Sequence, residues 1–352
     1  MSYYDDGDSD EFQYLPLDVC DNLLSRVFQR AGLCEYSLRA VVDGLLFASL
    51  RGIDSHGIKL APHYAACAAS GIKNPSPVFT STAVADASFR LNADGAFGLA
   101  AGKKAVEIGL PAADAHGISV VSVKNSTHPA AVSAVLAGAA RKGYVCIGAA
   151  NADSLMASYG GHSAFFGTNP ISFCAPMGDS IFTLDMATTH FTWNKVKIYR
   201  QVGKDLPSGV AVDSEGLITT DPEAAVALVP TGGHKGFALA AMVEILCSAL
   251  SGSLISHDIK PMYSPNLDAP RDLSQLYIFI SEALAGPAGV LSSRVRELSE
   301  RLIAAEPHDT QVTLPGIIED KIEENRRKNG LPVDNITYSA LVALAEGAKP
   351  VG

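Results

Sequence analysis

The sequence predicts an α/β fold, and the segment 117–176 supplies the main evidence. A β-branched run over 118–123 predicts a strand, and residues 144–150 predict the return strand. An alanine-rich helix is predicted between them, because two cations followed by Gly143 are typical of a helix C-terminus. No GxGxxG motif follows a strand and no GxxxxGK(S/T) motif occurs, so neither a Rossmann dinucleotide site nor a P-loop is predicted.

The rest of the chain alternates helical and strand patterns. Apolar spacing and end signals predict helices over 17–32, 36–50, 57–70, 94–116, 291–304, 315–330 and 338–346. Strands are predicted over 79–91, 180–186 and 274–281, and a polar surface loop over 256–274. The helix that follows Gly236 is apolar on nearly every face, which predicts that it is buried.

Composition indicates a globular protein and restricts its partners. Of 352 residues, 47% are apolar and 18% are charged, and the net charge of −10 argues against a nucleic-acid partner. No run approaches the roughly 18 apolar residues of a membrane span. The acidic, polar stretch 1–14 is expected to be a disordered tail. Six cysteines without a CxxC pair predict reduced thiols in a cytoplasmic protein.

His128 ends a polar turn that begins at Asn125. Pro129 suits the first position of the following helix, so His128 is expected at the positive end of a helix dipole. The dipole would keep the imidazole neutral, which suits an acid/base group. A histidine that merely caps the helix explains the same spacing.

Three further places have both a functional and a structural explanation. The GGHKG turn at 232–236 predicts an anion site through its free N–H groups and Lys235, or it is simply a glycine turn before a helix. His56 lies in a loop beside Gly57, which leaves backbone room for a ligand, or it is a structural loop histidine. Asp185 ends a strand and is either functional or the cap of a helix after it. No metal-binding spacing and no GxSxG motif occur, so neither a metal site nor a serine hydrolase is predicted.

Five motifs in one order resemble the malate/L-lactate dehydrogenase-like family. They are RGIDSHG at 51–57, NSTH at 125–128, GTNP at 167–170, LDMAT at 184–188 and PTGGHKG at 230–236. Members include ureidoglycolate, sulfolactate and 2,3-diketogulonate dehydrogenases and piperideine-2-carboxylate reductases. The resemblance covers nearly the whole chain, from about residue 15 to 345.

The resemblance implies an architecture and a set of site residues. The fold would be a non-Rossmann α/β arrangement with a large mixed sheet and an N-terminal helical region. A helical and substrate lobe is expected over 15–77 plus 226–352, an NAD(P)-binding lobe over 78–225, and a homodimer as the assembly. The implied catalytic residues are His128 for proton transfer, His56 for orienting the substrate and Asp185 as the acid near the nicotinamide. The implied contacts of NAD(P)H are Asn125, Ser126, Gly167, Thr168, Asn169, Asp185, Met186, Ala187, Lys195, His234 and Lys235. The implied substrate pocket contains Ser55, Lys59, Leu60, His63 and His190.

The chain also departs from the family pattern. Leu60 stands where the family usually carries an arginine that pairs with the substrate carboxylate, and leucine cannot replace that bidentate group. The other departures are Pro129 and Ala130 in place of an aromatic residue and a glycine, the segment 151–154, and the large side chains His190 and Trp193. Lys59 or His63 could take over the carboxylate.

These features predict an NAD(P)-dependent oxidoreductase that acts on a 2-oxo acid, its 2-hydroxy counterpart or a cyclic imine acid, with an atypical substrate. Two rivals remain at this point. One is a redox-neutral isomerase or lyase that uses His128 and Asp185, and the other is a non-catalytic binding protein.

Overall fold

The computed structural model describes residues 12–262, 270–306 and 312–350. Its largest element is a seven-stranded mixed sheet in the order β2-β3-β4-β13-β5-β8-β9. The strands are β2 (Thr80–Ala85), β3 (Ser88–Ala96), β4 (Ile118–Ser126), β5 (Val145–Ala150), β8 (Ile171–Met177), β9 (Ser180–Met186) and β13 (Leu273–Ile280). β13 lies between β4 and β5 and is antiparallel to both. The predicted βαβ unit is therefore split by a strand from the C-terminal part of the chain.

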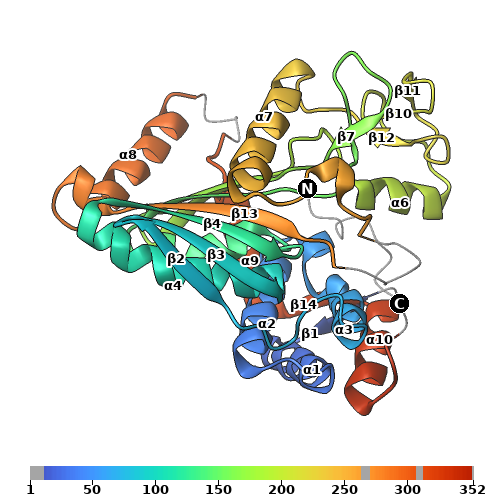
Figure 1. Ribbon diagram of the computed structural model, residues 1–352, viewed down its shortest axis with the longest axis horizontal. Helices are drawn as coiled ribbons and strands as arrows, with labels where there is room; N and C mark the ends of the chain where they lie inside the picture. Colours follow the sequence, from blue (N-terminus) through green and yellow to red (C-terminus); the bar gives the residue numbers. More distant parts are fainter. Residues whose placement is uncertain (1–11, 263–269, 307–311, 351–352) are drawn as a thin grey trace.

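Helices cover both faces of this sheet (Figure 1). α4 (Gly98–His116) and α5 (Val132–Ala140) pack on one face, where their alanines meet buried residues such as Val121 and Tyr277. α7 (His234–Glu244) and the π-helical turn after it pack on the other face through Val243 and Cys247. Ala130, in the connection from β4 to α5, belongs to the apolar core formed by the N-terminal helices.

A separate helical layer is built from both ends of the chain (Figure 1). It contains α1 (Leu17–Arg30), α2 (Glu35–Leu50), α3 (Ala61–Ala69) and α10 (Asn335–Glu346), which share one apolar core. β1 (Phe12–Leu15) pairs antiparallel with β14 (Leu331–Asp334) beside them. Residues 12–14 were expected in a disordered tail, and that expectation is wrong because their backbone is paired; residues 1–11 lie outside the described part.

A second, five-stranded sheet has the order β11-β10-β12-β6-β7. It comprises β6 (Met156–Ala157), β7 (Ala164–Phe166), β10 (Ala211–Val212), β11 (Ile218–Thr219) and β12 (Ala227–Leu228), and α6 (Trp193–Val202) packs on it. β12 and β13 both follow residue 226, yet each lies inside a sheet formed mainly by earlier strands. Strands that follow residue 226 thus complete both sheets, and the division into two lobes stays a prediction.

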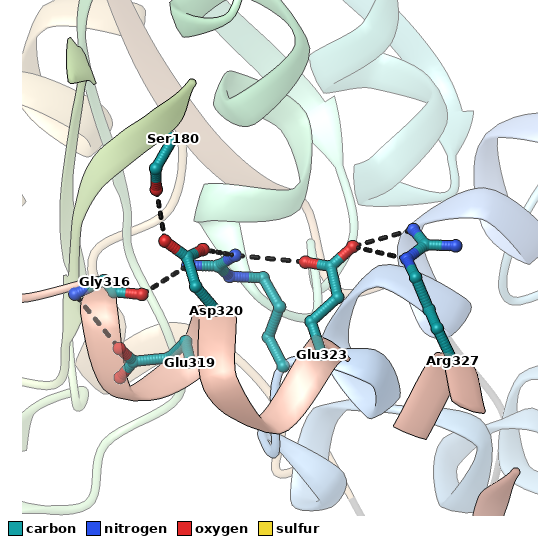
Figure 2. A network of polar contacts seen from close by, with 7 residues as sticks. Ser180, Gly316, Glu319, Asp320, Glu323 and Arg327 are labelled. Carbon is teal, nitrogen blue, oxygen red and sulfur yellow. Dashed lines mark hydrogen bonds and ion pairs between the residues drawn. The ribbon is translucent and has the colours of Figure 1, made fainter. Parts of the chain in front are cut away.

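α8 (Val290–Ala304) packs on β8, and α9 (Ile317–Asn329) joins the helical layer to β9. Arg51, at the end of α2, donates to Asp320 at 2.6 Å and to Glu323 at 3.1 Å on α9. Ser180 of β9 donates to the other oxygen of Asp320, and Arg327 pairs with Glu323 (Figure 2). This chain of charges ties α2, β9 and α9 together.

The predicted burial of the helix after Gly236 is wrong for the single chain. Val243 and Glu244 are buried, but Met242 is 41% exposed and Ile245 is 63% exposed. No helix in the described ranges is both long and apolar enough to cross a membrane.

Candidate active site

His128 and His56 face each other where the helical layer meets the large sheet. Their ring centroids are 5.5 Å apart. His56 ends a short 3-10 helix, Asp54–His56, and His128 lies in the connection between β4 and α5. The expected helix start at Pro129 is wrong: α5 begins at Val132, because Ala130 has φ +55° and cannot continue a helix.

Tyr64 of α3 fixes the orientation and the tautomer of His128. Its hydroxyl oxygen lies 2.9 Å from Nδ1 of His128 and 3.1 Å from the carbonyl oxygen of the same residue. A carbonyl oxygen can only accept, so the phenol proton goes to it and Nδ1–H donates to the phenol oxygen. The other ring nitrogen, Nε2, is then unprotonated. His128 is thereby set up to take a proton at Nε2.

Burial keeps the histidines of this cluster neutral at pH 7. It lowers the pKa of His56 to about 4 and that of His63, on α3, also to about 4. The pKa of His128 is well below the ordinary value, first because of burial and then because positive charge nearby opposes its protonation. That charge comes from Lys73 and Arg271, and from His56 and His63 only when they too are protonated. The expected neutral imidazole thus results from desolvation and neighbouring charges, since no helix begins at His128.

The loop that carries His56 is held to α9 by a buried ion pair. Arg326 of α9 donates to both carboxylate oxygens of Asp54, at 2.5 and 3.0 Å. Ser49 accepts a hydrogen bond from the Ile58 N–H at 2.9 Å, and a Cβ on Gly57 would lie only 2.1 Å from the Ser49 hydroxyl. The SHG turn therefore needs glycine for close packing. Ser55 contacts Nδ1 of His56 at 2.9 Å.

The predicted substrate residues are spread over different environments. Lys59 is exposed, and Leu60 is 4% exposed and packs in the core of the helical layer. His63 lies near the cluster with its Nε2 3.5 Å from the Cys67 sulfur, whereas His190 is exposed beyond β9. Lys59 therefore does not turn inward to replace the absent arginine.

Sequence reasoning missed three residues of this region: Tyr64, Lys73 and Arg271. Arg271 is buried, pairs with Asp153 and donates to the Lys260 carbonyl at 2.8 Å. Tyr64 was hidden in an apolar helix, and Arg271 was assigned to a surface loop because its surroundings in the sequence are polar. Lys73 is 3% exposed in the segment before β2, a burial that no local pattern indicates.

Asp185 holds α5 in place from the end of β9. Its Oδ2 accepts the Ser133 N–H at 2.8 Å, at the N-terminus of α5. Burial raises the Asp185 pKa to about 6, and the hydrogen bonds from Ser133 partly oppose that rise. The carboxylate thus caps a helix distant in sequence, rather than one that directly follows LDMAT.

Three motifs expected to bind the cofactor meet through their backbones. The Thr168 carbonyl accepts from both the N–H and the hydroxyl of Thr188, each at 2.9 Å. The Thr231 N–H donates to the Thr188 carbonyl, also at 2.9 Å. A Cβ on Gly167 would lie 2.4 Å from the Ala152 carbonyl oxygen, so only glycine fits there. GTNP, LDMAT and PTGGHKG are therefore one spatial unit, with Met186 and Ala187 half-buried beside it.

Several predicted cofactor residues have structural partners. Asn169 donates to Glu244 at 2.9 Å and to the Ala240 carbonyl at 3.0 Å, which fastens the GTNP turn to α7. The Ser126 hydroxyl accepts from Gln275 at 3.0 Å inside the sheet. Asn125 has φ +53° and donates to Asn92 at 3.1 Å. These three side chains therefore bind other residues of the protein and hold the backbone around the site in place.

At the start of α7, the groups available to an anionic ligand are mainly side chains, because most backbone amides of the turn are already bonded. Gly232 and Gly233 have φ of +61° and +64°, which the turn requires. The amides of Gly233, Lys235, Gly236 and Phe237 donate to carbonyls of their own turn, so the predicted free N–H groups are absent at these four residues. Lys235 and His234 are exposed on the first turn of α7, and Lys195 is half-buried on α6. This end of the helix presents positive charge to an anionic ligand.

No group of three or more His, Cys, Asp or Glu in the described ranges is placed to hold a metal ion.

Comparison with known proteins gives one consistent result. The family model "Malate/L-lactate dehydrogenase" matches residues 15–342. The chain is 33% identical over 331 residues to the ureidoglycolate dehydrogenase (NAD(+)) of Escherichia coli strain K12, covering 93% of this chain and 94% of the relative. It is 34% identical over 294 residues to the Delta(1)-pyrroline-2-carboxylate/Delta(1)-piperideine-2-carboxylate reductase of Pseudomonas putida, covering 82% and 86%.

A solved structure extends the likeness to the fold. The sulfolactate dehydrogenase of Methanocaldococcus jannaschii superposes with a TM-score of 0.87 at 28% identity, over 95% of this chain and 97% of that one. These relatives are oxidoreductases, and the family match spans both sheets and the helical layer. The chain belongs to the malate/L-lactate dehydrogenase family of oxidoreductases.

Proposed function

We propose that the protein is an NAD(P)-dependent oxidoreductase for a 2-oxo acid, its 2-hydroxy counterpart or a cyclic imine acid. The observation that carries this proposal is the double contact of the Tyr64 hydroxyl with Nδ1 and the carbonyl oxygen of His128, from which we infer that Nε2 is unprotonated. In the oxidation of a hydroxy acid, Nε2 takes the hydroxyl proton, and in reduction the imidazolium returns it. His56, placed opposite, orients the carbonyl or imine.

The converging motif unit is the proposed place for the nicotinamide cofactor, which supplies hydride transfer when it is bound. Lys235 would hold its phosphates through side-chain charge and His234 through a hydrogen bond, since the amides of Gly233, Lys235, Gly236 and Phe237 are already used. Thr168 and Ala187 border the same unit. Asp185 would act indirectly, by fixing α5 and hence the connection that carries His128.

The substrate is proposed to be atypical for the family. Leu60 packs in the helical core and Lys59 is exposed, so neither provides a fork for a carboxylate. A carboxylate left unpaired in a partly dry pocket binds poorly. Pyruvate and oxaloacetate are therefore expected to be poor substrates. The six free cysteines, five of them buried, suit a reducing compartment, and we place the protein in the cytoplasm.

Fluorescence titration with NADH and NADPH tests this proposal, followed by a panel of 2-oxo acids and cyclic imine acids. His128→Gln should bind the cofactor normally but lose turnover by on the order of 10²–10⁴-fold, the range for a general acid/base group. Lys235→Ala should weaken cofactor binding about tenfold, with Lys142→Ala, an exposed lysine elsewhere, as the control. Absence of NAD(P)H binding would contradict an oxidoreductase and favour redox-neutral chemistry.

A further inference from the structure

Lys73 is a buried cation that the proposed mechanism does not use. It is 3% exposed, and its Nζ has no hydrogen-bond partner among the described residues. Nζ lies 3.4 Å from the centroid of the Tyr64 ring and 5.0 Å from that of Phe97. A desolvated ammonium without a carboxylate partner is costly, and burial lowers the Lys73 pKa to about 7. The burial of this side chain therefore costs stability rather than adding to it.

One aromatic ring separates this cation from the proton-transferring histidine. Lys73 lies over the face of Tyr64, and the hydroxyl at the rim of the same ring is 2.9 Å from Nδ1 of His128. A positive charge acts over a longer distance in a dry interior than in water, because little solvent screens it. Lys73 therefore opposes a second positive charge on the imidazole and holds the Tyr64 ring in place by a cation–π contact.

We infer that Lys73 is a positioning residue for proton transfer: through Tyr64 it keeps His128 uncharged, with Nε2 free to accept the substrate proton. This inference rests on the proposed function, which assigns the proton transfer to His128. In the oxidation, the substrate O–H bond breaks and its proton joins the Nε2 lone pair. The O–H electron pair would form the new C=O bond, and the hydride from the carbon would go to the nicotinamide, which supplies the acceptor when it is bound. The resulting imidazolium faces the Lys73 ammonium across Tyr64, and this repulsion favours release of the proton.

The other titratable groups near Lys73 and His128 do not change their charge near neutral pH. Cys67 and Arg271 face Lys73; the Cys67 thiol pKa is raised by burial, and Arg271 is paired with Asp153. His56, His63 and Arg271 face His128, and both histidines are neutral at pH 7 because burial lowers the pKa of each. Lys73 is thus the member of this set whose charge changes near neutral pH.

The test is an NMR titration of the histidine side chains in the protein without cofactor or substrate. His128 is assigned by the loss of its signal in His128→Gln. In the wild type and in Lys73→Arg, which keeps the charge, the His128 pKa should lie well below that of an ordinary histidine. In Lys73→Met its pKa should rise by about one unit, a tenfold gain in proton affinity. Lys142→Met, which changes an exposed lysine in the turn after α5, should leave the titration unchanged.

Lys73→Met should fold, because an apolar residue of similar length removes a desolvated charge. Tyr64→Phe is the second variant: it removes the acceptor of Nδ1–H, and nitrogen shifts should then report a mixture of tautomers. In the pH profile of oxidation, Lys73→Met should shift the acid-side fall of kcat/KM to a higher pH. Lys73→Arg should return that fall to the wild-type pH.

An unchanged His128 titration in Lys73→Met would overturn the inference even if the enzyme is an active dehydrogenase. The converse result, a shifted titration without any dehydrogenase activity, would support the role of Lys73 and contradict the proposed function instead.

Discussion

Ala130 shows how a single residue shapes the site. It is 4% exposed, follows His128 by two residues and has φ +55°, a conformation that costs an alanine roughly 1–2 kcal/mol. This conformation ends the extended connection and delays the start of α5 to Val132. Relief of that strain should make Ala130→Gly more stable than the wild type by about 0.5–1 kcal/mol, after the larger entropy loss of glycine.

Urea unfolding followed by circular dichroism measures the change. Ala134→Gly, inside α5, is the matched control and should lose about 1 kcal/mol, because glycine is unfavourable in a helix. A loss of stability in Ala130→Gly equal to that of the control would show that the left-handed conformation at this position is not strained.

At this scale the sequence predicts the identity of the histidines but not their surroundings. His56 and His128 stand in recognisable turns, so the motifs point to them. No motif or turn in the sequence points to Tyr64 or Lys73. A tyrosine in an apolar helix usually serves packing, and a lysine before a strand usually serves solubility. Tyr64 contacts His128 across 64 residues of sequence, and Lys73 approaches His128 only through the Tyr64 ring, so only the folded chain brings the three together.

At the scale of elements, local signals predict most helices and strands, and the failures have physical causes. β1 pairs with β14 more than 300 residues away, so nothing within 1–14 indicates a strand. The start of α5 was misplaced because Pro129 is compatible with a first helical position, whereas Ala130 is not helical. The apolar pattern after Gly236 does predict a helix, but it overstates the burial of that helix in one chain.

α9 supports the His56 loop through the buried pair between Arg326 and Asp54. Removal of one member leaves the other charge buried without a partner, so Arg326→Met should destabilise the protein by about 3–5 kcal/mol. Since Asp54 directly precedes Ser55 and His56, turnover should also fall in whatever fraction remains folded. Thermal unfolding and kcat measure the two effects.

The double variant Arg326→Met, Asp54→Leu is the control for that prediction. It removes both charges and should recover most of the lost stability, because no unpaired ion remains. If Arg326→Met alone costs less than about 1 kcal/mol, the ion pair does not hold the loop.

At the scale of the whole molecule, β13 joins what the sequence suggested as separate lobes. It belongs to the C-terminal part of the chain, yet it completes the centre of the large sheet between β4 and β5. The same long-range assembly brings Thr168, Thr188 and Thr231 into one unit. No local pattern predicts such pairings, and only the order of the five motifs, through the family resemblance, indicated that they meet.

The surface of α7 and the turn after it supports the expected homodimer. Its large apolar side chains include Leu239 (38% exposed), Met242 (41%), Ile245 (63%) and Leu250 (58%), spaced along one side of the helix. An apolar stripe of this kind is typical of an interaction surface, and a helix apolar on nearly every face is fully buried only if a partner covers it. We propose that a second copy of the chain packs here.

Sedimentation of the full chain should therefore give a dimer at micromolar concentration, and Ile245→Glu should raise the dissociation constant at least tenfold. The change removes one apolar contact and places a charge in a dry interface, and each effect costs on the order of 1–2 kcal/mol. Ile336→Glu is the control, because Ile336 is 84% exposed on α10, on the opposite side of the large sheet (Figure 1). A wild-type monomer at micromolar concentration, or a dimer weakened equally by Ile336→Glu, would contradict this assignment of the interface.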